Sequence, residues 1–179
     1  MASELIVQTL KGPTSGANAN KVIIPSGQTL DASAGGLVPA SGQVVQCVQF
    51  YNPNPGDVTS TSASLVASGL KKTITPTYSD SLIIIQAHTS MSDHNNAGYL
   101  VISVFVNGSA MPGTGTYPMG YQDSGNGRYA GHIFQGQYQA TSTSPLEFEL
   151  YFRCDGGGQP TRVAHDGSTV AITLWEIKQ

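Results

Sequence analysis

Residues 146–153 read Leu-Glu-Phe-Glu-Leu-Tyr-Phe-Arg, and apolar side chains alternate with other residues along most of this stretch. Successive side chains of a β-strand point to opposite faces of its sheet. The pattern therefore predicts a strand in which Phe148, Leu150 and Phe152 face a core. The intervening Glu147 and Glu149 are expected to face water.

Short runs of the same kind occur along most of the chain, separated by Gly, Pro, Asn and Asp. We predict strands at Gln43–Tyr51, Ala63–Leu70, Lys72–Thr75, Ser81–His88, Gly98–Asn107, Arg128–Gln139, Leu146–Arg153, Thr161–Ala164 and Thr169–Ile177. Many short strands punctuated by turn residues are typical of an all-β sandwich or barrel.

The composition supports this fold class and excludes several functions. Only 11% of the 179 residues are charged, and the chain has 21 glycines. The net charge is −3 and no basic cluster exceeds Lys71-Lys72, which argues against nucleic acid as a partner. No apolar run approaches the ~20 residues of a membrane helix. The first residues lack the features of a signal peptide, so we expect synthesis in a cytoplasm.

The first 42 residues differ from the rest. Short apolar runs, such as Val22-Ile23-Ile24, stand there between stretches of Gly, Ser and Asn. Such runs bury too little area to offset about 1–2 kcal/mol of backbone entropy per ordered residue. The segment is therefore either disordered or ordered by another chain. We expect the second, with residues 1–42 as an extended attachment and oligomerisation segment and residues 43–179 as the β-sandwich domain.

Two predicted strands are apolar on both faces. Leu100, Ile102, Val104 and Val106 oppose Tyr99, Val101 and Phe105, and Val170, Ile172 and Leu174 oppose Trp175 and Ile177. Each sheet of a two-layer sandwich has only one face on the core. We expect a neighbouring subunit to cover the second face, and coverage by the long stretch between Asn107 and Arg128 is the alternative.

A further pattern of turn and strand residues is carried by several segments: Ile23–Asp31, Pro39–Gly42, Val44–Gln49, Gly69–Leu70, Thr73–Pro76, Ser79, Ser81–Ile85 and Val170–Ile177. In these segments the chain resembles phage fibre and head-decoration proteins. The resemblance spans nearly the whole chain except residues 89–127, and its motifs are structural. It implies a virion surface protein with a trimeric jelly roll of the C1q and tumour-necrosis-factor type, synthesised in the cytoplasm of a bacterial host. It implies no catalytic residues and does not distinguish capsid from tail.

Few residues suggest chemistry. His88, Asp93 and His94 are weak candidates for a metal site, because their spacing matches no known signature. Glu147 and Glu149 superficially match a glycosidase pair but are better explained as a solvated strand face. His132 is expected in the core or an interface, and His165-Asp166-Gly167 in a tight turn. We therefore predict no enzyme activity and no cofactor.

Binding is the remaining function. Cys47 and Cys154 are expected to be buried reduced thiols, although a disulfide between them is an open alternative. Tyr117, Tyr121, Tyr129 and Tyr138 stand among Asn, Gln and Gly, a mixture found on binding surfaces. The leading hypothesis is a homotrimeric virion structural protein held to capsid or tail proteins by residues 1–42. The alternative is a carbohydrate-binding module for host surface glycans.

Overall fold

The computed structural model describes residues 12–17, 19, 22–23, 26–27, 38–94, 99–112, 130–155, 160–165 and 167–179, with the side chains of 90–94, 99, 130 and 155 outside the description. The chain separates into two units, Met1–Val38 and Pro39–Gln179. In the first unit, Ala19 N donates to Gly16 O across a turn. The second unit starts four residues before the expected domain, because Gly42 N donates to Lys178 O.

The second unit is built from β-strands, and no helix occurs among its described residues. The strands are β1 Val44–Asn52, β2 Val58–Ser60, β3 Val66–Ile74, β4 Leu82–His94, β5 Tyr99–Val106, β6 Ser109–Ala110, β7 Ala130–Gln139, β8 Leu146–Asp155, β9 Thr161–Ala164 and β10 Val170–Ile177. Correspondingly, no helix in the described part of the chain is long and apolar enough to cross a membrane.

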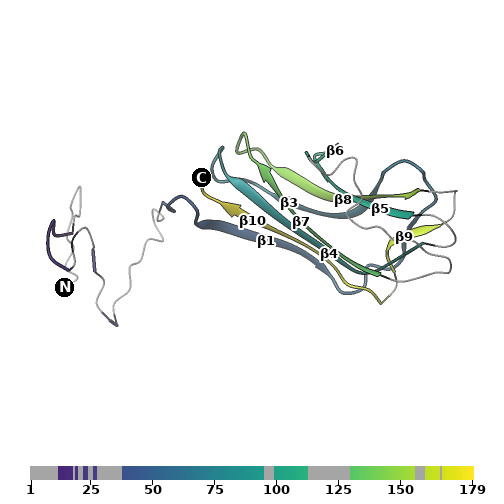
Figure 1. Ribbon diagram of the computed structural model, residues 1–179, viewed down its shortest axis with the longest axis horizontal. Coiled ribbons are helices and arrows are strands. Elements are labelled where there is room, and N and C mark those ends of the chain that lie inside the picture. The colour runs from purple at the N-terminus through teal and green to yellow at the C-terminus, as the bar shows by residue number, and fades with distance from the viewer. Residues whose placement is uncertain are drawn as a thin grey trace, which may run out of the picture. The chain divides into compact units, whose positions relative to one another are not determined.

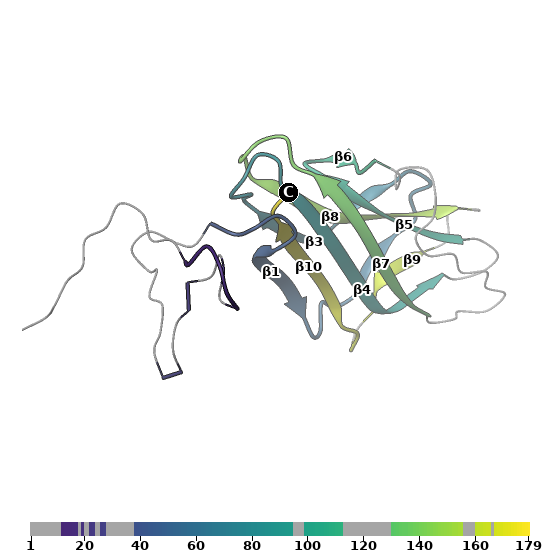
Figure 2. The same cartoon turned by 60° about the vertical axis from the view of Figure 1, so that its left-hand side comes forward.

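The strands form two antiparallel sheets. One has the order β1-β10-β4-β9-β2, with β7 paired to β4, and the other has the order β3-β8-β5-β6. Figure 2 shows β1, β10, β4 and β7 side by side, with β3, β8 and β5 in the other layer. The pairs β1–β10, β3–β8, β4–β7 and β5–β6 are nested in sequence. This nesting is the jelly-roll arrangement, so the predicted fold class is confirmed.

The core lies between the two layers seen in Figure 1. Phe148, Leu150 and Phe152 of β8 are almost fully buried, as the alternating sequence predicts. They pack in one cluster with inward residues of the other sheet, including Ile85 of β4 and Leu174 of β10. The strand register inferred from residues 146–153 is therefore confirmed.

Two details of the strands differ from the prediction. Ala63–Leu70 and Lys72–Thr75 are replaced by the single strand β3, whose pairing with β8 shifts register between Ala67 and Lys71. Within this irregularity Gly69 has φ +76°, a conformation that glycine adopts without strain. The short strands β2 and β6 were not predicted, because three and two residues carry no readable alternation.

The two strands that are apolar on both faces have different environments. In β5, Val101 and Ser103 on the outer face are buried within the single chain. Val101 therefore needs no neighbouring subunit to cover it, whereas Phe105 on the same face is only partly buried. In β10, Trp175 and Ile177 lie on the outer face of their sheet and are only partly buried. The open apolar face thus belongs to the sheet that contains β10.

Candidate assembly surface

The outer face of the sheet β1-β10-β4-β7 is the candidate assembly surface. It consists of the side chains that alternate with the core residues of these strands: Cys47, Gln49, Tyr51, Leu82, Ile84, Gln86, His88, Ile133, Gln135, Gln137, Gln139, Ala171, Thr173, Trp175 and Ile177. None of these residues is Asp, Glu, Lys or Arg. Figure 2 shows the four strands side by side as one broad layer.

The strand register orders this surface into rows. Gln49, Thr173, Gln86 and Gln135 form a polar row across all four strands. Within this row Gln49 Nε2 donates to Thr173 Oγ1 at 3.0 Å. The next row outward runs from Tyr51 through Ala171 and His88 to Ile133. Its two ends are prominent, because Tyr51 is 61% exposed and Ile133 is 70% exposed.

Charge is distributed unequally between the two sheets. The outer face of the sheet β3-β8-β5-β6 carries Lys71, Glu147, Glu149 and Arg153. Lys71 Nζ lies 3.0 Å from Glu147 Oε2, and Glu149 Oε1 accepts a hydrogen bond from Gly69 N. Depletion of charge is characteristic of the buried centre of protein interfaces. The uncharged sheet face is therefore the better candidate for contact with another protein.

The candidate assembly surface is hollowed along β4 and β7. A depression of about 330 Å³ is lined by Ile84, Gln135, Gly136 and Gln137. A second one of about 440 Å³ is lined by Leu82, Pro112, Gln137, Tyr138 and Gln139. Both combine neutral amides with aliphatic side chains, which suits a partner that offers uncharged polar and apolar groups.

Glu176 stabilises one end of the same sheet and was missed by the sequence analysis. Its carboxylate is fully buried and faces the sandwich interior. It accepts hydrogen bonds from Ser81 Oγ (2.6 Å), Gln46 Nε2 (2.6 Å), Thr77 N (2.7 Å) and Tyr78 N (3.1 Å). The signal was present in the sequence, because Glu176 continues the inward alternation of Ile172 and Leu174.

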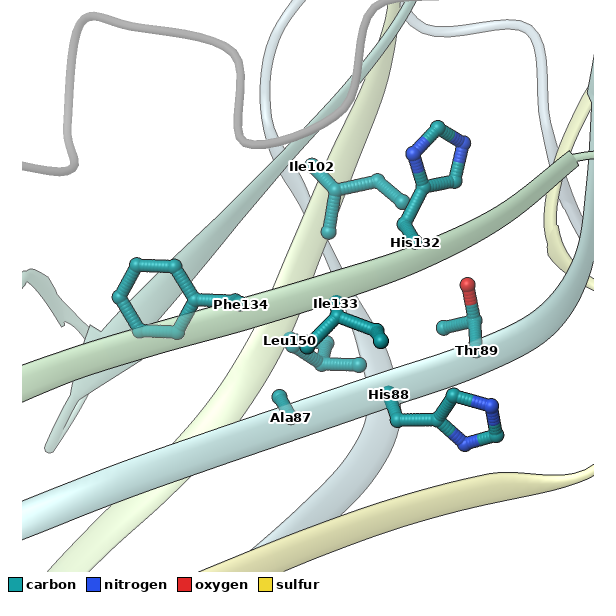
Figure 3. A pocket seen from close by; sticks show the side chains of 8 residues that line it. All are labelled: Ala87, His88, Thr89, Ile102, His132, Ile133, Phe134 and Leu150. Carbon is teal, nitrogen blue, oxygen red and sulfur yellow. The ribbon is translucent and has the colours of Figure 1, made fainter.

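The proposed metal residues are not brought together by the described structure. His88 lies on the candidate assembly surface, on the opposite side of β4 from Thr89 (Figure 3). Asp93 and His94 pair through the backbone with Arg162 and Thr161 of β9, and their side chains lie outside the described residues. Among the described residues, no group of three potential ligands forms a metal site.

The other candidate residues occupy positions that support the fold. Glu147 and Glu149 occupy a strand face, but Glu149 also binds the Gly69 backbone, so the expectation of a merely solvated carboxylate was incomplete. His132 faces the interior and is half-buried, in the core as anticipated. His165 O accepts from Ser168 N across the expected turn, and its Nδ1 lies 3.5 Å from Asp57 Oδ1. Asp166 lies outside the described residues.

The structure corrects two further expectations. Cys154 is buried, but Cys47 is exposed on β1, and no disulfide joins the two. The prediction of two buried thiols was therefore wrong for Cys47. Tyr138 is not part of an exposed loop, because it lies in β7 and packs edge-on against Phe148 at 5.9 Å. Tyr117, Tyr121 and Tyr129 lie outside the described residues.

No family model matches the chain. No curated protein matches its sequence either. Among solved structures, the chain is similar to a sugar-binding protein, the EclA C-terminal domain, at 12% identity, covering 97% of this chain and 99% of that one with a TM-score of 0.35. It is also similar to the capsid of Ralstonia phage GP4, at 13% identity, covering 80% of this chain and 90% of that one with a TM-score of 0.34. Both similarities are distant.

Proposed function

We propose that this chain is a phage virion structural protein, a capsid-decoration, head-fibre or short tail-fibre component on the virion surface. It acts by homotrimeric assembly and surface exposure, without catalysis. The sequence resemblance to phage fibre and head-decoration proteins supports this class. The observation that carries the proposal is the uncharged outer face of the sheet β1-β10-β4-β7. On this face Tyr51 and Ile133 are exposed and Trp175 is only partly buried.

The outer face of β1-β10-β4-β7 is the proposed subunit interface. Burying its apolar side chains contributes about 25 cal/mol per Å² removed from water. No charged group needs to be desolvated there, since Asp, Glu, Lys and Arg are absent from these outward positions. In a cyclic trimer, one part of this face on each subunit packs against a different part of the neighbouring subunit, and the ring closes after three copies.

Two measurements test the assembly together. Light scattering should give three times the chain mass of 18.7 kDa. Cys47, which is exposed on the proposed interface of the single chain, should react slowly with a thiol reagent in the assembly and rapidly after dissociation. Cys154 is the matched control, because it is buried in the single chain and should stay protected in both states. A monomer with a reactive Cys47 would contradict the proposal.

Attachment to the particle is proposed to use residues 1–42. Deleting them should leave a folded β-sandwich, because the core cluster begins in β1 with Val48 and Phe50. The truncated protein should no longer co-sediment with particles that lack the full-length chain. Loss of the fold would assign these residues to the core, and retained co-sedimentation would place attachment on the sandwich.

Carbohydrate binding is the second candidate function. It is favoured by the depression lined by Ile84, Gln135 and Gln137, because amides and aliphatic groups together suit a neutral sugar. A glycan array probed with the intact assembly and with a dissociated variant separates the two functions. Binding only by the dissociated variant would identify this depression as a site that subunit contact covers, whereas binding by the assembly would place a sugar site elsewhere on the surface.

A further inference from the structure

Two buried polar atoms on neighbouring strands have no hydrogen-bond partner in the described structure. They are Thr89 Oγ1 of β4 and His132 Nε2 of β7. The two residues are direct partners in the strand register, and both alternate with outward residues so that they face the interior. Thr89 is only 2% exposed. Its hydroxyl lies on the side of β4 that faces His132 in Figure 3.

A small cavity adjoins both residues. It has a volume of about 10 Å³, and its other walls are Ala87, His88, Ile102, Ile133, Phe134 and Leu150. Ile102 and Leu150 belong to the opposite sheet, so the cavity lies between the two layers. A volume of roughly 10–15 Å³ is the least that holds one water molecule. The cavity is therefore large enough for a water and too small for a larger ligand.

Buried hydroxyl groups and imidazole nitrogens rarely remain without hydrogen-bond partners, because losing their hydrogen bonds to water without replacement costs free energy. The other residues around the cavity are mainly apolar and offer no replacement hydrogen bond. A water molecule both donates and accepts, so it can satisfy the hydroxyl and the ring nitrogen together. We propose that this cavity binds one ordered water molecule, which bridges Thr89 Oγ1 and His132 Nε2.

The water bridge suits a neutral imidazole. Burial lowers the pKa of His132 from its usual 6.5. The residues that face it from β5 and β8 are Ile102 and Leu150, which do not ionise, and from β4 they are Ala87 and Thr89. His88 also borders the cavity but lies on the other side of β4 (Figure 3). No described carboxylate therefore lines the cavity to favour the charged ring.

The bridge would connect an edge strand to the centre of its sheet. β7 pairs with β4, and on the outer side of the same two strands His88 lies opposite Ile133. Those outer residues belong to the candidate assembly surface. A water that holds Thr89 and His132 together therefore also stabilises the strand position that presents Ile133.

A crystal structure at high resolution, together with three variants, tests the site. We expect one solvent peak at about 2.7–3.2 Å from both atoms. Thr89→Val preserves shape and removes the hydroxyl, and His132→Phe removes the ring nitrogens. Each single substitution should lower the melting temperature by roughly 2–8 °C, because it leaves the remaining polar atom with a poorly held water. The double variant should lose less than the sum of the two.

Three results would overturn the inference. One is a cavity without solvent density in the wild-type protein. Another is a direct hydrogen bond between Thr89 Oγ1 and His132 after a change of rotamer. The third is additive effects of the two substitutions, which would show that each residue acts alone. Water-to-protein nuclear Overhauser effects at the methyl group of Thr89 give an independent reading in solution.

Discussion

Ser81 Oγ donates a hydrogen bond to Glu176 Oε1 at 2.6 Å inside the sandwich. This contact joins the loop before β4 to the end of β10, and the backbone nitrogens of Thr77 and Tyr78 donate to the same oxygen. Gln46 of β1 extends the network, because its Nε2 lies 2.6 Å from Glu176 Oε2 and 2.7 Å from Thr75 O. Four donors compensate this buried carboxylate for the water it loses. Glu176 therefore stabilises the junction of β1, the loop before β4 and the end of β10.

Replacing Glu176 with Gln should destabilise the sandwich by about 1–3 kcal/mol. The glutamine is isosteric, but its NH₂ group would face either Gln46 Nε2 or the donors Ser81, Thr77 and Tyr78. Urea unfolding of both proteins measures the difference. Glu147→Gln is the matched control, because that side chain is partly exposed and pairs with Lys71 at the surface. Its effect should stay below about 0.5 kcal/mol, and equal effects would contradict the assigned role.

The Glu176 network should also make the fold sensitive to acid. Burial by itself would raise the pKa of Glu176, but the hydrogen bonds from Ser81, Gln46, Tyr78 and Thr77 together hold it below its usual 4.5. A lowered folded-state pKa contributes stability that is present above the unfolded-state pKa and is lost as the pH falls through the folded-state value. Unfolding free energy should therefore decline below about pH 4.5, and less steeply in Glu176→Gln.

His132 should act in a higher pH window. Its pKa is lowered by burial, so the folded state favours the neutral ring. Protonation in the unfolded chain then opposes folding, and stability should fall as the pH drops below 6.5 and level off beneath the folded-state pKa. The pH dependence of stability between pH 7 and 5 should be reduced in His132→Phe. An unchanged slope in that variant would show that other groups dominate this range.

The alternation of apolar residues was sufficient to predict most strands and the core face of β8. It places Cys47 on the same face of β1 as Gln49 and Tyr51, but it could not show that this face of the sheet stays exposed in the folded chain. It could not separate β5 from β10 either. Both are apolar on two faces, and only the folded chain shows that Val101 is buried internally while Trp175 remains partly open.

The β8 strand gives a direct test of burial against exposure. Leu150→Ala should cost about 2–5 kcal/mol, because Leu150 is fully buried between the sheets. Glu149→Ala should cost about 1 kcal/mol, because it removes the acceptor of the Gly69 N hydrogen bond at the β3 irregularity. Glu147→Ala should cost less than either, since its contact with Lys71 is at the surface. Denaturant unfolding of the three variants should give this order. A larger loss for Glu147→Ala than for Glu149→Ala would show that the hydrogen bond from Gly69 N to Glu149 does not stabilise the fold.

A charge placed at the centre of the candidate assembly surface should dissociate the proposed trimer without unfolding the subunit. Gln86 is exposed in the single chain and lies between Thr173 and Gln135 on the outer face. Gln86→Lys brings one ammonium group per subunit into the proposed interface, whose outward positions on these four strands include no carboxylate. Burying an unpaired charge is strongly unfavourable.

The control for this substitution is Thr73→Lys, which is also an exposed strand position and lies on the charged sheet opposite Glu147. Light scattering should report a mass near 18.7 kDa for Gln86→Lys and the trimer mass for Thr73→Lys. Far-ultraviolet circular dichroism should show the same β-sheet content in both. A trimer that tolerates lysine at position 86 would exclude this face as its interface, whereas dissociation by both substitutions would show that net charge, rather than position, controls the assembly.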